Sequence, residues 1–283
     1  MRIDGKLIAE AVKVQVTADL KRLPKMPTLA ILVSQETPVI RTFINIKKKV
    51  AETLGVPMVE YGHNALANEG DFLHQLLDAA HKHDGIVVQL PLSPHLSIES
   101  VRNILPITHD VDVLGTTAYG QFSENRLPIL PPVSGAIDAI LRHHQMTLRG
   151  KNVVVIGAGL LVGAPSARYA TRMGAASVTV VTDTKGSLAE ALLNADVIIS
   201  GAGVPGLVKP EMIKDGVLIF DAGTSESGGK VVGDEDPLCE TKAALFTPTP
   251  GGIGPVTVAM IFHNLVHLTA LRQGVALDGI LSE

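Results

Sequence analysis

Short apolar runs rich in β-branched residues alternate with amphipathic stretches along most of the chain. In the first half this pattern predicts helices over residues 8–23 and 38–54, and strands over residues 28–34 and 84–92. Such an alternation is typical of βα units whose strands form a parallel sheet. Residues 103–135 are rich in Pro, Gly, Thr and Asp and have weak periodicity, so we expect a connecting segment there.

A second series of strands and helices begins at Lys151. Residues 151–174, KNVVVIGAGLLVGAPSARYATRMG, form the pattern of a buried strand, a glycine-rich turn and a helix. Further strands are predicted at residues 177–181, 196–203 and 217–223, with helical stretches between them. The second half therefore has the pattern of a doubly wound, dinucleotide-binding sheet.

The final apolar segment, residues 256–272, has helical periodicity and can return to pack on the first half. We therefore expect an α/β protein of two domains. Residues 1–139 and 256–283 would form a smaller α/β domain completed by the C-terminal helix. Residues 140–255 would form a Rossmann-like domain with a doubly wound parallel sheet.

Composition narrows the class of protein. A chain of 283 residues can bury a sizeable core, and its single cysteine, Cys239, cannot form an internal disulfide. The net charge of -4 gives no general attraction to nucleic acid. Residues 1–14 are charged throughout, unlike a signal peptide, and no apolar run reaches the length of about 18 residues that spans a membrane. We expect a cytoplasmic protein without nucleic-acid or membrane partners, and we assign no metal ligands.

The glycine-rich turn contains Gly157, Gly159 and Gly163, in the spacing G-x-G-x-x-x-G. This is one residue longer than the usual dinucleotide fingerprint, and a strand-to-helix turn without a ligand is the alternative. The strand and helix on either side favour cofactor binding, because a helix amino terminus offers free N–H groups to a pyrophosphate. The predicted cofactor-binding residues are Gly157, Ala158, Gly159, Leu160, Val162, Gly163, Thr182, Asp183 and Thr224.

Asp183 follows the second strand of this half, 26 residues after Gly157. A carboxylate there can accept hydrogen bonds from a ribose 2'-hydroxyl and would repel a 2'-phosphate, which favours NAD over NADP. The alternatives are a turn-starting Asp in TDTKGS and a phosphate-attracting role for Lys185 nearby. The cofactor is therefore NAD or NADP, with a preference for NAD.

The segment FINIKKKV, residues 43–50, contains three adjacent lysines that are not equivalent on a helix. At about 100° per residue, Lys47 falls inside the apolar stripe, whereas Lys48 and Lys49 point away from it. An amine held among apolar groups has a lowered pKa, which suits proton transfer. The alternative is a lysine whose ammonium reaches water. The stripe consists of Ile40, Phe43, Lys47, Val50, Ala51 and Leu54.

Other polar residues end predicted strands or lie in loops. Gln89 ends the strand GIVVQL, at the carboxyl end where parallel sheets place ligands, and its neutral amide could orient a lysine. Asp110 and Asp112 alternate along an extended segment, so they face opposite sides, and either could bind a heterocycle or cap a turn. The loop TPTPGGIGPVT, residues 247–257, is preset in shape by its prolines and glycines, which favours a ligand wall over a simple turn.

Taken in order, these segments resemble the bifunctional methylenetetrahydrofolate dehydrogenase/methenyltetrahydrofolate cyclohydrolase family over nearly the whole chain. VVQLPL is similar to the family's V-Q-L-P-L, and TPTPGGIGPVTVA is similar to its T-P-V-P-G-G-V-G-P-M-T. GKVVGDED is similar to the family's G-K-x-x-G-D-V segment. The resemblance implies oxidation of 5,10-methylenetetrahydrofolate by NAD or NADP, followed by hydrolysis of the methenyl product to 10-formyltetrahydrofolate. It also implies a homodimer.

The resemblance also implies roles for residues. The lysine of the family's Tyr-x-x-x-Lys motif corresponds to Lys47, the glutamine that positions it to Gln89, and the pterin-binding aspartate to Asp112. The folate would lie in a cleft between the domains. The substrate-binding residues are Phe43, Pro250, Gly251, Gly252, Ile253, Gly254 and Pro255.

The chain departs from the family pattern at both sites. Phe43 replaces the tyrosine, Gly159 stands where the family's Gly-x-Ser has Ser, and Thr182-Asp183 replaces its usual His-Ser. Three alternatives follow: a family member that has lost the cyclohydrolase activity, a nucleotide-binding regulatory protein without catalysis, and a different two-domain dehydrogenase acting on a small acid.

Overall fold

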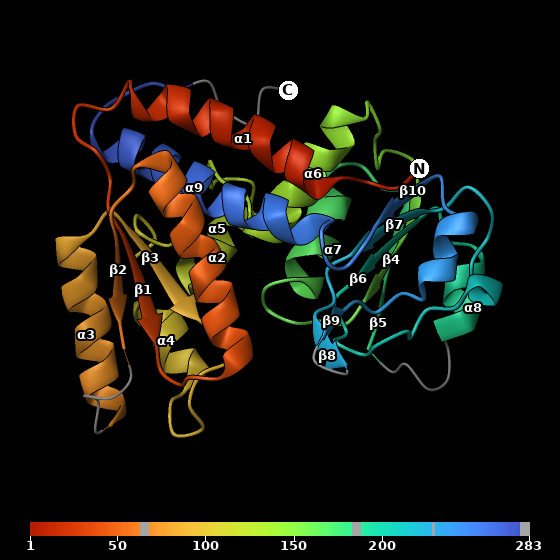
Figure 1. Cartoon of the computed structure of the whole chain (residues 1–283), viewed down its shortest axis with the longest axis horizontal. Helices are drawn as coiled ribbons and strands as arrows, with labels where there is room; N and C mark the ends of the chain where they lie inside the picture. Colours follow the sequence, from red (N-terminus) through yellow and green to blue (C-terminus); the bar gives the residue numbers. More distant parts are fainter. Residues whose placement is uncertain (63–67, 183–187, 228–229, 278–283) are drawn as a thin grey trace. The chain divides into compact units, whose positions relative to one another are not determined.

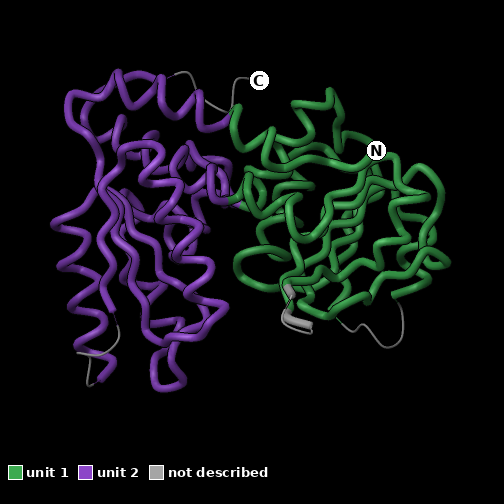
Figure 2. Tube along the Cα trace, in the orientation of Figure 1, with its two compact units in different colours: residues 1–11, 133–257 green, residues 12–132, 258–283 purple. Residues whose placement is uncertain are grey.

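The computed structural model describes residues 1–62, 68–182, 188–227 and 230–277. The chain divides into two compact units (Figure 2). Unit 1 comprises residues 1–11 and 133–257, and unit 2 comprises residues 12–132 and 258–283. The limits fall at 132/133 and 257/258 rather than at the expected 139/140 and 255/256, and the first eleven residues group with unit 1. The functional domain division stays a prediction.

Unit 2 contains a parallel sheet of three strands in the order β2-β1-β3. Every residue of β1 and β3 is buried, whereas β2 is partly exposed at the edge of the sheet. Helices α2 and α3 flank the sheet (Figure 1). The strands are β1 (Leu29–Val33), β2 (Met58–Tyr61) and β3 (Gly85–Gln89), and the helices are α2 (Pro38–Leu54), α3 (Glu69–Lys82), α4 (Ile98–Ile104) and α5 (Thr116–Ser123).

Helix α2 has the predicted limits because local residues start and stop it. The Thr37 side chain accepts a hydrogen bond from the Ile40 N–H, and Pro38 occupies the first turn, where no N–H is needed. Gly55 ends the helix with φ of 68°, a left-handed conformation that glycine adopts without strain. Buried Ile44, which the predicted stripe omits, lies on the core side of the helix.

Helix α9 (Ile253–Arg272) returns to the first half of the chain as predicted. The buried Asn264 amide donates to the carbonyl oxygens of Val111 and Leu130, both at 2.8 Å, and Arg272 donates to the carbonyl oxygens of Thr108 and Asp84. The helix is long and apolar enough to cross a membrane, but most of it is buried inside the protein. Its apolar character is therefore that of a core helix.

Unit 1 contains a parallel sheet of five strands in the order β10-β7-β6-β4-β5, which confirms the Rossmann-like prediction. The strand order reverses between β4 and β6, and this switch point is where open α/β sheets bind ligands. The strands are β4 (Asn152–Ile156), β5 (Ser177–Val181), β6 (Val197–Ser200), β7 (Leu218–Asp221) and β10 (Leu245–Thr247).

The remaining elements of unit 1 cover or extend this sheet, with α7 and α8 beside it (Figure 1). Residues 1–3 pair with β10, because the Ile3 N–H donates to the Phe246 carbonyl and the Phe246 N–H to the Met1 carbonyl. The elements are α6 (Pro132–His143), α7 (Gly163–Arg172), α8 (Leu188–Leu193), the hairpin of β8 (Ser225–Ser227) and β9 (Lys230–Val232), and the 3-10 helices η2 (Pro210–Met212) and η3 (Pro237–Thr241); helix α1 (Gly5–Leu20) spans the limit between the units.

The expected connecting segment, residues 103–135, is more ordered than its weak periodicity indicates. It contains α5 and the first residues of α6. Asp110 fixes the backbone of this segment, because its buried carboxylate accepts the N–H groups of Leu114 and Gly115 at 3.1 and 2.7 Å. A side chain that satisfies its own loop fixes that loop without a periodic apolar pattern.

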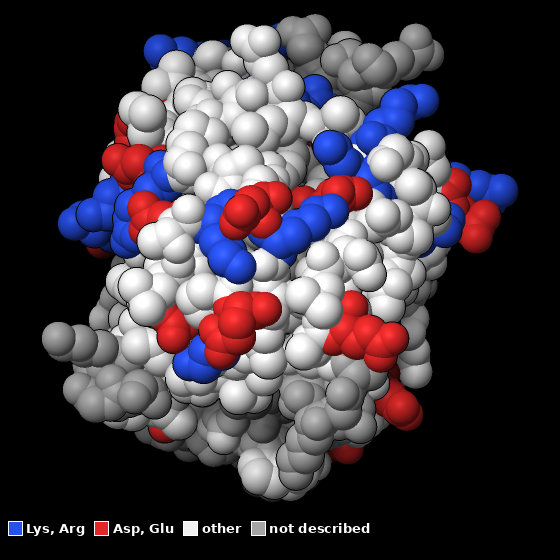
Figure 3. Space-filling view, turned by 90° about the vertical axis from the view of Figure 1, so that its right-hand side faces the viewer, with Lys and Arg blue, Asp and Glu red and all other residues white. Residues whose placement is uncertain are grey.

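The face of the molecule drawn in Figure 3 carries acidic and basic side chains interspersed among uncharged ones. The described charged residues on that face therefore create no field of a single sign. This mixture agrees with the small net charge of the chain.

Candidate functional site

Lys47 of α2 and Gln89 of β3 are joined directly. The Lys47 Nζ donates to the Gln89 Oε1 at 2.9 Å. The Gln89 Nε2 in turn donates to the Leu90 carbonyl oxygen at 2.8 Å, which orients the amide so that its oxygen points to the lysine. A buried neutral acceptor can thus hold the amine without adding charge.

The three lysines of α2 differ as helical geometry predicts. Lys47 is half-buried, whereas Lys48 and Lys49 are exposed. Burial lowers the pKa of Lys47, and the charge of Asp112 opposes that shift. Because its Nζ is bonded to the buried Gln89 amide, Lys47 does not simply extend its ammonium into water.

Asp112 and Asp110 differ in their main partners, although the charge of Asp112 also acts on Asp110. Burial raises the pKa of Asp112 to about 6, and the positive charge of Lys47 counteracts this rise. Burial raises the pKa of Asp110 to about 7, although the two backbone hydrogen bonds from Gly115 and Leu114 favour its ionised form. Asp110 therefore caps a turn, while Asp112 is the aspartate that interacts electrostatically with Lys47.

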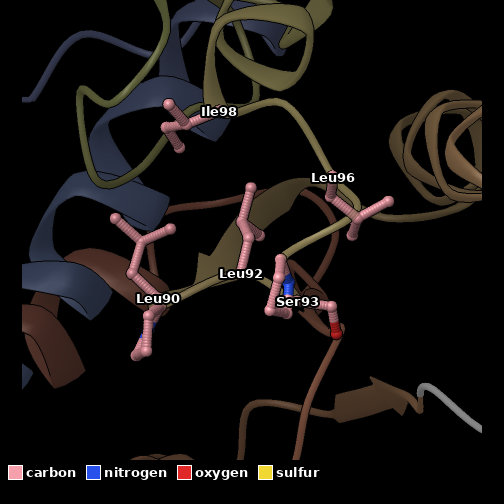
Figure 4. A pocket seen from close by; sticks show the side chains of 7 residues that line it. Leu90, Leu92, Ser93, Leu96 and Ile98 are labelled. Atoms are coloured by element: carbon pink, nitrogen blue, oxygen red, sulfur yellow. The ribbon is translucent and has the colours of Figure 1, made fainter.

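A pocket of about 560 Å³ follows Gln89 directly along the chain (Figure 4). Its lining is mostly aliphatic, and Leu90 both lines it and accepts the hydrogen bond from Gln89. A ligand in this pocket would therefore meet mostly aliphatic side chains. The lining residues are Leu90, Pro91, Leu92, Ser93, Pro94, Leu96 and Ile98. Phe43 lies half-buried on α2, one helical turn before Lys47.

The glycine-rich turn of unit 1 lies at the switch point of its sheet. Gly157 has φ of 90°, and a Cβ there would lie 2.8 Å from the Gly201 carbonyl oxygen, at the end of β6. A Cβ on Gly163 would lie 2.0 Å from the Gly157 carbonyl oxygen, so that glycine permits close packing of α7 on the turn. No described residue has an atom within 4 Å of the Cβ position of Gly159, and the residue is exposed, so its backbone can be approached by a ligand. These features fit a dinucleotide.

The other predicted cofactor residues differ in how far they are exposed. Ala158 and Thr224 are exposed, and Leu160 and Val162 are half-buried. Thr182 follows β5, whereas Asp183 lies outside the described residues. The longer glycine spacing is accommodated because α7 begins only at Gly163.

The predicted ligand loop at residues 247–255 is tied to its own unit. The Gly251 carbonyl accepts the Gly5 N–H at 2.9 Å, and Gly251 has φ of 105°. Gly252 is buried, and a Cβ there would lie 2.7 Å from the Pro248 carbonyl oxygen. Ile253 is buried at the start of α9, while Pro250 and Gly254 are exposed and Pro255 is half-buried. The glycines therefore meet steric requirements of the loop itself.

Sequence reasoning missed a group of buried carboxylates in unit 1. Asp221 ends β7, and Asp234 and Glu235 follow β9; all three are buried. The Asp234 carboxylate accepts the N–H groups of Ala202 and Val204, in the turn that follows β6 beside Gly157. The acidic run GDED at residues 233–236 was the available signal for this group.

Two profiles of one protein family match most of the chain. Residues 3–112 match the profile described as tetrahydrofolate dehydrogenase/cyclohydrolase, catalytic domain. Residues 131–273 match the profile described as tetrahydrofolate dehydrogenase/cyclohydrolase, NAD(P)-binding domain. The two profiles together span most of the chain, and they place Lys47 and Gly157 in different functional regions.

Similar proteins match over nearly their full length. The bifunctional protein FolD of Fusobacterium nucleatum is 31% identical over 284 residues, covering 97% of this chain and 100% of the relative. The crystal structure of the bifunctional enzyme FolD from Campylobacter jejuni is 29% identical, with a TM-score of 0.91 and coverage of 96% and 99%. The Trypanosoma brucei FolD structure, in complex with NADP and an inhibitor, is 29% identical, with a TM-score of 0.87 and coverage of 96% and 98%.

We expect Lys47→Met to raise the pKa of Asp112 further, by about one unit above its value of about 6, because the lysine charge favours the ionised carboxylate. Carboxyl carbon NMR over a pH series measures this shift, with Asp112→Asn to assign the signal. Lys48→Met is the matched control, since Lys48 is exposed, and should leave the signal unchanged. An unchanged pKa in Lys47→Met would contradict the interaction.

Proposed function

The chain belongs to the tetrahydrofolate dehydrogenase/cyclohydrolase family, and from that premise we propose that it oxidises 5,10-methylenetetrahydrofolate and hydrolyses the methenyl product to 10-formyltetrahydrofolate. The single observation that carries the assignment of residues is the Lys47–Gln89 hydrogen bond with Asp112 in electrostatic reach. Full-length similarity to bifunctional relatives supports both activities.

In the hydrolysis, Lys47 is the residue that handles protons. The methenyl substrate is a cation, so a second positive charge beside it would raise the barrier. Burial lowers the pKa of Lys47 and thereby favours its neutral form, which can accept a proton from the attacking water. Gln89 holds the amine in place without adding charge, and Asp112 offers a carboxylate to N–H groups of the pterin.

In the oxidation, NAD(P) would be held by residues 157–163, through exposed backbone of the turn and the amino terminus of α7. The cofactor supplies the hydride acceptor when bound. The protein's part is to fix the turn: Gly157 allows close approach to the end of β6, and Gly159 leaves its backbone open. The tetrahydrofolate derivatives are the proposed small-molecule partners.

A second candidate function is a family member that retains only the dehydrogenase. Phe43 is the observation that favours it, because a phenyl ring keeps the packing one turn before Lys47 but has no hydroxyl. The two candidates differ only in the hydrolysis step, which can be assayed by itself.

We expect Lys47→Ala and Lys47→Met to lower the rate of methenyltetrahydrofolate hydrolysis by about 100-fold or more, since each removes the proton acceptor. Lys48→Met should keep the native rate, because Lys48 is exposed. Absorbance of the methenyl compound measures hydrolysis, and formation of reduced cofactor measures oxidation with NAD or NADP.

The same assays separate the alternatives. Equal hydrolysis rates in the native protein and Lys47→Ala would remove Lys47 from the mechanism. Hydrolysis that is absent in the native protein and restored by Phe43→Tyr would support the dehydrogenase-only function. Folded protein that forms neither methenyl product nor reduced cofactor would refute the proposed function and favour a regulatory nucleotide-binding role.

The cofactor preference is proposed to be NAD over NADP. Support comes from the sequence position of Asp183 after β5, where a carboxylate would repel a 2'-phosphate. We expect Asp183→Asn to raise the ratio of kcat/KM for NADP to that for NAD by about tenfold. Asp215→Asn, at an exposed acidic residue of the same unit, is the control. A native preference for NADP would contradict the assignment.

The protein is proposed to be a homodimer formed through β5. This strand is at the edge of the unit 1 sheet, and its residues SVTVV include exposed Thr179 and Val180 but no charge or proline. Soluble monomers usually protect an edge strand with charges, prolines or bulges. Pairing with a second copy would satisfy the open backbone groups. We also propose a cytoplasmic location from the composition of the chain, which cell fractionation can test.

We expect Thr179→Lys and Val180→Lys to convert the dimer to a monomer in sedimentation velocity, because a buried lysine at the centre of the pairing would be desolvated without a partner. The control is Val59→Lys on β2, an edge strand of the unit 2 sheet, which already carries Glu60. A native protein that sediments as a monomer would refute the dimer.

A further inference from the structure

Glu235 is a buried carboxyl group that the proposed chemistry does not use. The residue is 5% exposed, and neither side-chain oxygen has a hydrogen-bond donor among the described residues. It stands where the family segment G-K-x-x-G-D-V has valine. A carboxyl group in an apolar position needs a proton or a specific partner to be stable there.

Asp221 is the carboxylate beside it. Its Oδ1 accepts the N–H groups of Gly223 at 2.9 Å and Asp234 at 3.2 Å, and its Oδ2 faces the Glu235 N–H at 3.5 Å. A Cβ on Gly233 would lie 1.7 Å from the Asp221 Oδ2, so the chain passes directly over this carboxylate. Burial raises the pKa of Asp221, and these N–H donors oppose that rise by favouring its ionised form.

The surroundings of the pair are acidic. Asp234 accepts hydrogen bonds from the Ser200 hydroxyl and from turn N–H groups, and Cys239 of η3 donates its thiol hydrogen to the Val208 carbonyl. Lys209 pairs with Asp236 at 3.1 Å. Of these groups, Asp221 and Asp234 are the ones whose charges act on Glu235, and both are acids. Two adjacent buried carboxylates cannot both ionise without a large repulsion.

We propose that Glu235 and Asp221 share one proton, with the Glu235 hydroxyl donating to the Asp221 carboxylate, and that this pair positions the cofactor-binding turns of unit 1. Glu235 carries the proton because its oxygens have no hydrogen-bond donor within the described part of the chain, whereas Asp221 accepts two backbone N–H groups. The inference rests on the proposed function, since it concerns binding of NAD(P).

The contacts lead from this pair to the cofactor turn in short steps. Asp221 fixes Gly223, which precedes Thr224, and the Ser225 hydroxyl donates to the Gly203 carbonyl at 2.8 Å. Asp234 fixes the turn 200–204, whose Gly201 lies against Gly157. Loss of the shared proton would place two charges among these turns, beside the site of a phosphate-bearing ligand. Glu235 is thus a positioning residue and does not itself contact the cofactor.

The surroundings of Glu235 favour its protonated form, as the shared proton requires. Burial raises the pKa of Glu235 well above its ordinary value, and the charge of Asp221 raises it further. The folded protein therefore binds more protons than the unfolded chain at pH values between the unfolded and folded pKa of Glu235. Stability and cofactor affinity should both fall as the pH rises through the folded pKa.

The test is the KM for NAD, or for NADP if it is the better substrate, over about pH 6 to about pH 9 at saturating methylenetetrahydrofolate. The native KM should rise with pH, approaching about tenfold per pH unit above the pKa of the pair, while kcat stays constant. Glu235→Gln retains a donor but cannot titrate, and Glu235→Val restores the family residue; both should give a flat KM profile. Glu211→Gln, at an exposed glutamate of the same unit, should keep the native profile.

Infrared difference spectra of the native protein and Glu235→Gln, recorded without cofactor at neutral pH, should show the carbonyl stretch of a protonated carboxyl group. Absence of that band overturns the shared proton, whatever the enzyme's activity. A native KM profile that Glu235→Gln and Glu235→Val leave unchanged overturns the positioning role. Complete lack of dehydrogenase activity would instead refute the proposed function, and the infrared result would still decide the protonation of Glu235.

Discussion

The hydrogen bond between the Lys47 amine and the Gln89 amide is the interaction on which the candidate folate site depends. It joins the middle of α2 to the carboxyl end of β3, so the lysine's position follows from the packing of a helix on a sheet. A carboxylate in place of Gln89 would hold the amine as firmly but would favour its charged form. The neutral amide holds the amine while leaving burial free to lower its pKa.

Unit 1 also buries ionisable groups, but these are acids rather than an amine. Its strands β6 and β7 end in turns that surround Asp221, Asp234 and Glu235, and no apolar pattern would place acids there. Backbone N–H groups of those turns stabilise Asp221 and Asp234, as they would stabilise a bound anion. The same peptide groups therefore shape the turns and compensate the buried charge, which makes the shape of the turns depend on the protonation of the carboxylates.

The parts of the fold that follow from periodicity were predictable. Helix α2 has the predicted limits, β1 and β3 fall within predicted strands, and α9 packs on the first half as expected. Strand β2 and the helix in residues 103–135 were missed, because β2 has four residues at an exposed edge and α5 follows a loop fixed by Asp110. The hydrogen bond between Lys47 and Gln89 joins residues 42 positions apart. Helical angles single out Lys47 but do not identify its partner on the strand. The buried group of Asp221, Asp234 and Glu235 was missed because it forms only when turns that are distant in the sequence lie together in space.

The two departures from the family pattern, Phe43 and Glu235, change different physical quantities. A phenyl ring for a phenol ring removes one hydroxyl and keeps the shape, so its effect is confined to hydrogen bonds that a ligand or water would make near Lys47. A carboxyl group for a valine keeps roughly the volume but adds a proton-binding group to a site that already contains two acids. Phe43 therefore bears on the rate of one chemical step at any pH. Glu235 bears on the shape of the cofactor turns, and it does so only over the range of pH in which its proton is lost.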